Sequence, residues 1–154
     1  MSAEAKLREL GIQLKEVPVG DRPLIPSVLT GNLLFLSGAG PSFSGKKWSG
    51  QLGTDYSVEE GYEAARECGL QLLSAARTAL GSLDRVRRVV KVLGMVNTAP
   101  GFSQQPQVIH GCSDLLVEVF GENGRHARSA VGMAGLPSNI PVEIEIILEV
   151  EPQR

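Results

Sequence analysis

Apolar and small residues recur at helical spacing in the middle of the chain, over residues 57–81. Ser57 with Glu60 three residues later predicts a capping box at the start of this helix, and Gly81 predicts its end. The residues that recur on one side are Val58, Tyr62, Ala65, Gly69, Leu72, Ala76 and Ala79. Because small residues dominate this stripe, we expect the helix to lie close against a sheet.

Two further helices are predicted. A short one covers residues 3–10, and a longer one starts near Pro106, which suits a first helical turn, and ends at Gly121. The apolar stripe of the longer helix consists of Val108, Cys112, Leu115 and Val119.

Short apolar or alternating runs predict strands over residues 31–38, 88–98, 128–136 and 142–150. Residues 40–53 are rich in glycine and serine and predict a loop or an irregular hairpin at the surface. In the last strand Val142, Ile144, Ile146, Leu148 and Val150 point to one side, and Glu143, Glu145, Ile147 and Glu149 point to the other. The order of elements predicts an α+β fold, a sheet with two helices packed on one face.

The other face of this predicted sheet has no covering element within the chain. A face of mixed apolar and charged side chains is typical of subunit interfaces, so self-association is the simplest cover.

Composition restricts the class of protein. A chain of 154 residues with 42% hydrophobic residues suits one domain over residues 1–154. The net charge of −2 speaks against nucleic acid as a partner. In the basic stretch at 84–92 the charged residues alternate with valine, which is the pattern of a strand. No apolar stretch approaches the roughly 20 residues of a membrane span, and the charged N-terminus lacks a signal-peptide pattern. We therefore expect a cytoplasmic protein with no membrane partner.

Several chemistries lack support in the sequence. There is no glycine-rich nucleotide motif and no serine in a hydrolase motif, and two histidines without a cysteine cluster are too few for a metal site. Cys68 and Cys112 fall at inward helix positions and read as buried, reduced thiols. His110 is either a functional acid or base or, more commonly for a single histidine, a partly exposed structural residue.

Arg128 is the main candidate for a binding residue. It lies in residues 126–150, which read as the most buried segment. Its strand continues with small residues, so the side chain has room to extend over Ala130 and Gly132. A guanidinium there could bind a small carboxylate ligand through two parallel hydrogen bonds, or it could pair with Glu143, Glu145 or Glu149. A plain hairpin of the last two strands would place Arg128 opposite Glu149 and about 20 Å from Glu143. Arg128 and Glu143 then share a site only if the strands are arranged differently or if the site lies between two chains.

The segment "HARSAVGMAGLPSNIPVEIEIILEV" closely resembles the C-terminal signature of the YjgF/RidA family, also called the endoribonuclease L-PSP family, and "GNLLFLSGAGP" resembles a second family segment. The resemblance implies a chorismate-mutase-like fold, a homotrimer with sites between subunits, and no cofactor. It also implies hydrolysis of reactive enamines and imines, such as 2-aminoacrylate, to 2-oxo acids and ammonia. By motif, Arg128 would bind the substrate carboxylate and Glu143 would position the attacking water. The same motifs place Ser37, Gly38 and the backbone of Ala130 against the ligand.

The sequence departs from the family's deaminases at two places. Leu24 stands where they have a tyrosine, and residues 110–113 occupy the neighbourhood of an asparagine on their second helix. The leading hypothesis is an enamine and imine deaminase, which Arg128 and Glu143 favour. The alternative is a non-catalytic trimer that binds a small carboxylate metabolite, which Leu24 favours. A ribonuclease is less favoured, because the chain has neither net positive charge nor an aromatic and basic groove.

Overall fold

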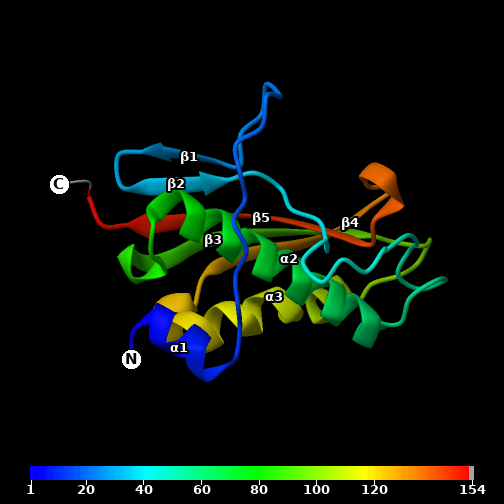
Figure 1. The fold of residues 1–154 in the computed structure, drawn as a ribbon. Helices are drawn as coiled ribbons and strands as arrows, with labels where there is room; N and C mark the ends of the chain where they lie inside the picture. The colour runs from blue at the N-terminus through cyan, green and yellow to red at the C-terminus, as the bar shows by residue number, and fades with distance from the viewer. Residues whose placement is uncertain (153–154) are drawn as a thin grey trace.

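A computed structural model of the protein describes residues 1–152 (Figure 1). The helices are α1 (Ala3–Glu9), α2 (Val58–Leu80) and α3 (Gln105–Phe120), and the strands are β1 (Ser27–Thr30), β2 (Leu33–Leu36), β3 (Val86–Asn97), β4 (Ala127–Met133) and β5 (Val142–Val150). Short 3₁₀ turns lie at Leu83–Arg85, Gly121–Gly124 and Pro137–Asn139. The three helices and four of the strands match the predicted elements; β1 was not predicted. No helix among the described residues is both long and apolar enough to cross a membrane.

The ends of α2 follow their local signals. The Ser57 side chain accepts a hydrogen bond from the Glu60 backbone, the Glu60 side chain accepts one from the Ser57 backbone, and Gly81 closes the helix with φ of 80°. The predicted apolar stripe was too narrow. Ala79 is exposed, whereas Ala64, Leu73 and Ala75 are buried, because α2 packs against both β5 and α3.

Small residues bring α2 and α3 together. A Cβ atom added at Gly111 of α3 would lie 1.9 Å from the backbone oxygen of Tyr62, and one at Gly69 of α2 would lie 2.8 Å from Leu115. The small residues of α2 predicted a close approach to a sheet. In the structure they allow mainly a close approach to the neighbouring helix α3.

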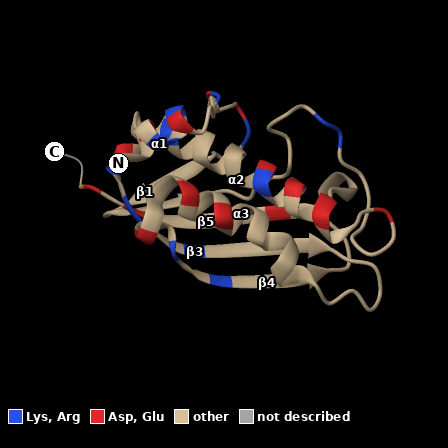
Figure 2. Cartoon of the chain, turned by 90° about the horizontal axis from the view of Figure 1, so that it is seen from below, with Lys and Arg blue, Asp and Glu red and all other residues tan. Residues whose placement is uncertain are grey.

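The five strands form one sheet in the order β1-β2-β5-β3-β4, in which β4 runs parallel to β3 and every other neighbouring pair is antiparallel. α2 and α3 pack on one face of it, and Figure 2 shows α3 lying in front of β3 and β4. The hairpin considered for β4 and β5 is wrong, because β3 lies between them. The expectation that residues 126–150 are the most buried segment holds for β5 but is wrong for β4, an edge strand in which no residue is fully buried.

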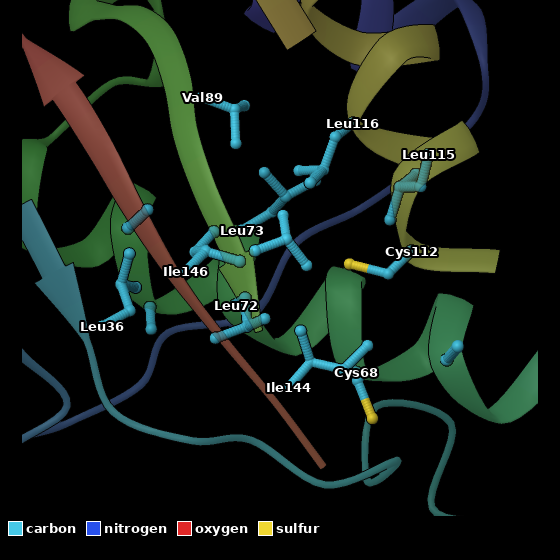
Figure 3. Packing of buried hydrophobic residues seen from close by; sticks show 14 of the residues in the cluster. Leu36, Cys68, Leu72, Leu73, Val89, Cys112, Leu115, Leu116, Ile144 and Ile146 are labelled. Carbon is cyan, nitrogen blue, oxygen red and sulfur yellow. The ribbon is translucent and has the colours of Figure 1, made fainter. Parts of the chain in front are cut away.

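The core lies between the sheet and the helices. The predicted inward residues of β5 are all buried, and Ile144 and Ile146 pack there with Leu72 and Leu116 (Figure 3). The predicted surface loop over residues 40–53 is irregular, but it is not confined to the surface: Trp48 and Leu52 are buried in the same core.

The sheet face away from the helices combines exposed apolar side chains with charges. Val28 is 51%, Phe35 41% and Val131 38% exposed. Glu145 and Lys91 line a hollow of about 320 Å³ on the same face. This is the face that the β5 pattern left without a cover.

Candidate functional site

Arg128 lies near the start of the edge strand β4, and its side chain extends toward α3. The strand pairing sets it beside the buried Val92 of β3, so it points to the helix side of the sheet. Its Nη1 group donates hydrogen bonds to His110 Nδ1 at 3.0 Å and to Ser113 Oγ at 3.2 Å. His110 and Ser113 are three residues apart on α3 and therefore share one face of that helix.

A second histidine extends this set of hydrogen bonds. His126 Nε2 lies 2.9 Å from Ser113 Oγ, and His126 Nδ1 lies 2.6 Å from the backbone oxygen of Gly124. A carbonyl oxygen only accepts, so Nδ1 has the hydrogen, and in the neutral ring Nε2 then accepts from the Ser113 hydroxyl. The result is a directed series from Arg128 through Ser113 and His126 to the backbone of Gly124.

His126 is held in its neutral form. Burial lowers its pKa and is the largest cause; the hydrogen bond to Gly124 opposes this, and the nearby charge of Arg128 adds to it. At His110 the guanidinium of Arg128 can only donate, so Nδ1 is the acceptor of that hydrogen bond.

We expect thermal stability to fall as the pH drops below 6.5, the ordinary pKa of histidine, and to fall less in His126→Gln. Because the folded-state pKa of His126 is lowered, the unfolded chain binds this proton first. The contribution of the neutral ring is therefore complete above pH 6.5 and is lost as the pH falls toward the folded-state value. Melting temperatures measured from about pH 8 to pH 5 for both proteins test this. Parallel curves would contradict it.

Arg128 makes no salt bridge within the described residues, since none of the four ion pairs there includes it. Glu143 and Glu145 lie on β5, two strands away, and their pairing with Met95 and Leu93 places them on the opposite face of the sheet. The pairing of Arg128 with Glu143, Glu145 or Glu149 is therefore wrong for a single chain. Arg128 is half-buried, and its guanidinium bonds to His110 and Ser113 instead of a carboxylate.

Glu143 belongs to a second cluster. A Cβ atom added at Gly38 would lie 3.1 Å from Glu143 Oε2, so the absence of a side chain at Gly38 lets the carboxylate lie against the backbone of the segment after β2. Ser37 donates a hydrogen bond from its hydroxyl to the backbone oxygen of Ile25 at 2.6 Å, and thereby fixes the segment before β1.

A groove of about 270 Å³ opens beside this second cluster and is lined by Leu24, Ser37 and Gly38, together with parts of residues 17–26 and α2. Leu24 is 57% exposed. The structure therefore places Leu24 in the same groove as Ser37 and Gly38.

Within one chain the predicted site residues form two groups. Ser37, Gly38 and Glu143 lie together, whereas Arg128 and Ala130 lie on β4, beyond β3 and at the opposite edge of the sheet. Ser113 and His126 were not identified as candidates from the sequence. The three-residue spacing of His110 and Ser113 was legible, but nothing in it indicates contact with a strand that follows later in the chain.

The two cysteines are buried and free, as predicted. Burial raises the pKa of Cys112 to about 12 and that of Cys68 well above its usual value, so both thiols are protonated at neutral pH. Among residues 1–152 no group of three or more histidine, cysteine or acidic side chains is placed to hold a metal ion.

Comparisons with known proteins agree along nearly the whole chain. Residues 4–149 match the model of the family described as "YjgF/chorismate mutase-like, putative endoribonuclease". Protein TCP17 of Trypanosoma cruzi is 45% identical over 148 residues, which cover 95% of this chain and 92% of that protein.

Two solved structures are also similar. The protein Atu1372 from Agrobacterium tumefaciens is 44% identical with a TM-score of 0.87, over 97% of this chain and 92% of that one. A protein from Shewanella oneidensis, described as a "putative endoribonuclease", is 33% identical with a TM-score of 0.91, over 97% of this chain and 100% of that one.

Proposed function

The chain belongs to the YjgF/chorismate mutase-like family, and from this premise we propose that it hydrolyses small enamines and imines of the 2-aminoacrylate type to 2-oxo acids and ammonia. The main support is the state of Arg128, a half-buried residue whose guanidinium bonds to His110 and Ser113 and has no carboxylate partner among the described residues. A charge kept in such a place without an internal counter-ion suits an anionic ligand.

In the proposed reaction Arg128 binds the substrate carboxylate. An enamine reacts as its imine tautomer. Glu143 accepts a proton from water as the water oxygen bonds to the imine carbon, and returns this proton to the nitrogen, which gives a neutral carbinolamine. The hydroxyl proton of the carbinolamine then moves to the nitrogen as the carbon–nitrogen bond breaks, which releases ammonia and leaves the 2-oxo acid. The imine carbon is already electrophilic, so the protein's task is to hold the carboxylate and the water in place. No cofactor is required.

Arg128 and Glu143 lie on opposite faces and at different strands of the same sheet, so one chain does not bring them together. We therefore propose a site between subunits, in which Arg128 and Ala130 of one chain face Ser37, Gly38 and Glu143 of another.

The direct test is an assay of ammonia and 2-oxo acid release from freshly generated 2-iminopropionate. We expect release above the uncatalysed rate, and its loss in Glu143→Gln, which keeps the shape of the side chain but no longer accepts a proton. A parent protein with no effect on the rate would contradict the catalytic proposal.

The proposed site requires more than one chain, and the assembly that we propose for it is a homotrimer. We expect light scattering or sedimentation to give three times the 16.4 kDa mass of the chain. The exposed apolar side chains of the open sheet face, Val28, Phe35 and Val131, would then be covered by a neighbouring subunit. A stable monomer would contradict the assembly and remove the shared site.

Leu24 supports the second candidate function, a trimer that binds a small carboxylate metabolite without catalysis. Its apolar side chain lines the groove beside Ser37 and Gly38, where a tyrosine would add a hydroxyl. If that hydroxyl matters, Leu24→Tyr should raise the rate of imine hydrolysis in a folded trimer. An unchanged rate would show that the position is neutral. Pyruvate binding without any hydrolysis would establish the second function instead.

A further inference from the structure

The hydrogen bonds of Arg128 are confined to one end of its guanidinium. Its Nη1 group has two hydrogens, and the two acceptors on α3, His110 Nδ1 and Ser113 Oγ, lie within hydrogen-bond distance of it. Within residues 1–152 the Nε and Nη2 hydrogens have no side-chain or backbone acceptor. These two groups form one straight edge of the planar guanidinium, the edge that matches the two oxygens of a carboxylate.

We propose that Ser113 and His126 form a positioning relay for Arg128. The relay holds the Nη1 group of Arg128 on α3, so that the Nε–Nη2 edge of the guanidinium faces a ligand carboxylate. The relay rests on the proposed function, because it takes Arg128 as the carboxylate-binding residue. It adds two residues to that function and specifies a bidentate, side-on carboxylate as the ligand chemistry.

His126 gives the relay its direction. A serine hydroxyl rotates freely and can turn its hydrogen toward a neighbouring cation as easily as its lone pairs. Here His126 Nε2, at 2.9 Å, takes the Ser113 hydrogen, so a lone pair of Oγ faces Arg128. His126 is itself fixed at Nδ1 by the backbone oxygen of Gly124. The orientation of the guanidinium is thereby tied to the backbone of the turn that joins α3 to β4.

Such an arrangement reduces the cost of ligand binding. A long arginine side chain loses rotamer freedom when it engages a ligand, and a side chain already held in its binding geometry loses less. The relay residues need not touch the ligand. Removing them should weaken binding while the Arg128 charge stays in place, which separates a positioning role from a charge role.

The first experiment measures pyruvate binding by titration calorimetry in matched variants. We expect Ser113→Ala and His126→Leu to weaken binding about three- to tenfold, the range of one hydrogen bond. Ser113→Thr, which keeps a hydroxyl, and His126→Gln, which keeps an acceptor, should recover most of the affinity. The control is Tyr62→Phe, which removes the 2.8 Å hydrogen bond from Tyr62 to Asp114 on another side of α3 and should leave pyruvate binding unchanged.

The second experiment needs no ligand. In arginine-selective ¹⁵N spectra, the Arg128 guanidinium signal is assigned by its absence in Arg128→Ala, and the rotation of its Nη groups is measured. We expect slow rotation in the parent protein and in Tyr62→Phe, and faster rotation in Ser113→Ala and His126→Leu.

The outcomes separate the two proposals. Equal Nη rotation rates in the parent protein and in Ser113→Ala would overturn the relay and leave the proposed function intact. So would equal pyruvate affinities of these two proteins, provided that the parent binds pyruvate. No pyruvate binding by the parent, together with relay-dependent rotation, would overturn carboxylate capture at Arg128 and leave the hydrogen-bonded series as a structural feature.

Discussion

Arg128→Ala is expected to abolish measurable binding of pyruvate while the protein stays folded and assembled. Losing a charged bidentate partner from a partly desolvated site costs about 2–5 kcal/mol of binding free energy. The fold should tolerate the change, because within residues 1–152 Arg128 bonds to His110 and Ser113 and has no carboxylate partner that its removal would leave unpaired. Titration calorimetry with pyruvate, beside thermal unfolding with and without the ligand, measures both effects.

A structural role for Arg128 predicts the reverse pattern. If a glutamate of a neighbouring subunit pairs with it, Arg128→Ala would leave a buried carboxylate without its partner and destabilise the assembly by about 3–5 kcal/mol. The parent protein would then show no change in melting temperature with pyruvate. Arg128→Lys is the matched control, since it keeps the charge but loses the planar edge. Intermediate affinity in that variant is expected if the edge matters.

The elements whose signals are local were predicted well. The capping box at Ser57 and Glu60, the glycine ends of α2 and α3, and the alternation in β5 each depend on residues that are neighbours in the chain. The four-residue strand β1 was missed, because its sequence is short and only half-buried and its strand character comes from pairing with β2.

Strand partners could not be predicted from the same signals. Alternation in β5 determines which side chains face the helices, but it is equally compatible with β4 or with β2 and β3 as neighbours. The link over 134–141 has the length of a hairpin loop, yet it carries the chain past β3 to the middle of the sheet. Ser138 and Asn139 adopt left-handed backbone angles there, with φ of 55° and 57°.

Strand order bears directly on the candidate site. A hairpin of β4 and β5 would have placed Arg128 opposite Glu149, whereas the observed order separates Arg128 from the glutamates of β5 by β3 and by the thickness of the sheet. The motif resemblance identified Arg128 and Glu143 without using strand order. The partners of Arg128 required the structure, because His110 and Ser113 lie 18 and 15 residues away in the chain and meet Arg128 only where β4 returns beneath α3.

Gly111→Ala is expected to destabilise the protein by about 3 kcal/mol in the free energy of unfolding, at the upper end of overpacking effects. The added Cβ would lie 1.9 Å from the backbone oxygen of Tyr62 and 3.1 Å from the backbone nitrogen of Arg66. Backbone atoms cannot rotate away, so α2 and α3 must separate. The higher helix propensity of alanine, worth about 1 kcal/mol, offsets only part of this cost.

Urea unfolding at one fixed protein concentration measures the effect, with Gly135→Ala as the control, because a Cβ there meets no atom within 4 Å. Gly111 also adjoins His110 on the helix that supplies Ser113, so separating α2 from α3 should displace both acceptors of Arg128 and weaken pyruvate binding as well. If the free energy of unfolding of Gly111→Ala lay within about 0.5 kcal/mol of the parent value, the change would be in the ordinary range of surface substitutions. The helices would then not be held at the distance described. The placement of His110 and Ser113 would then need another cause than the contact between α2 and α3.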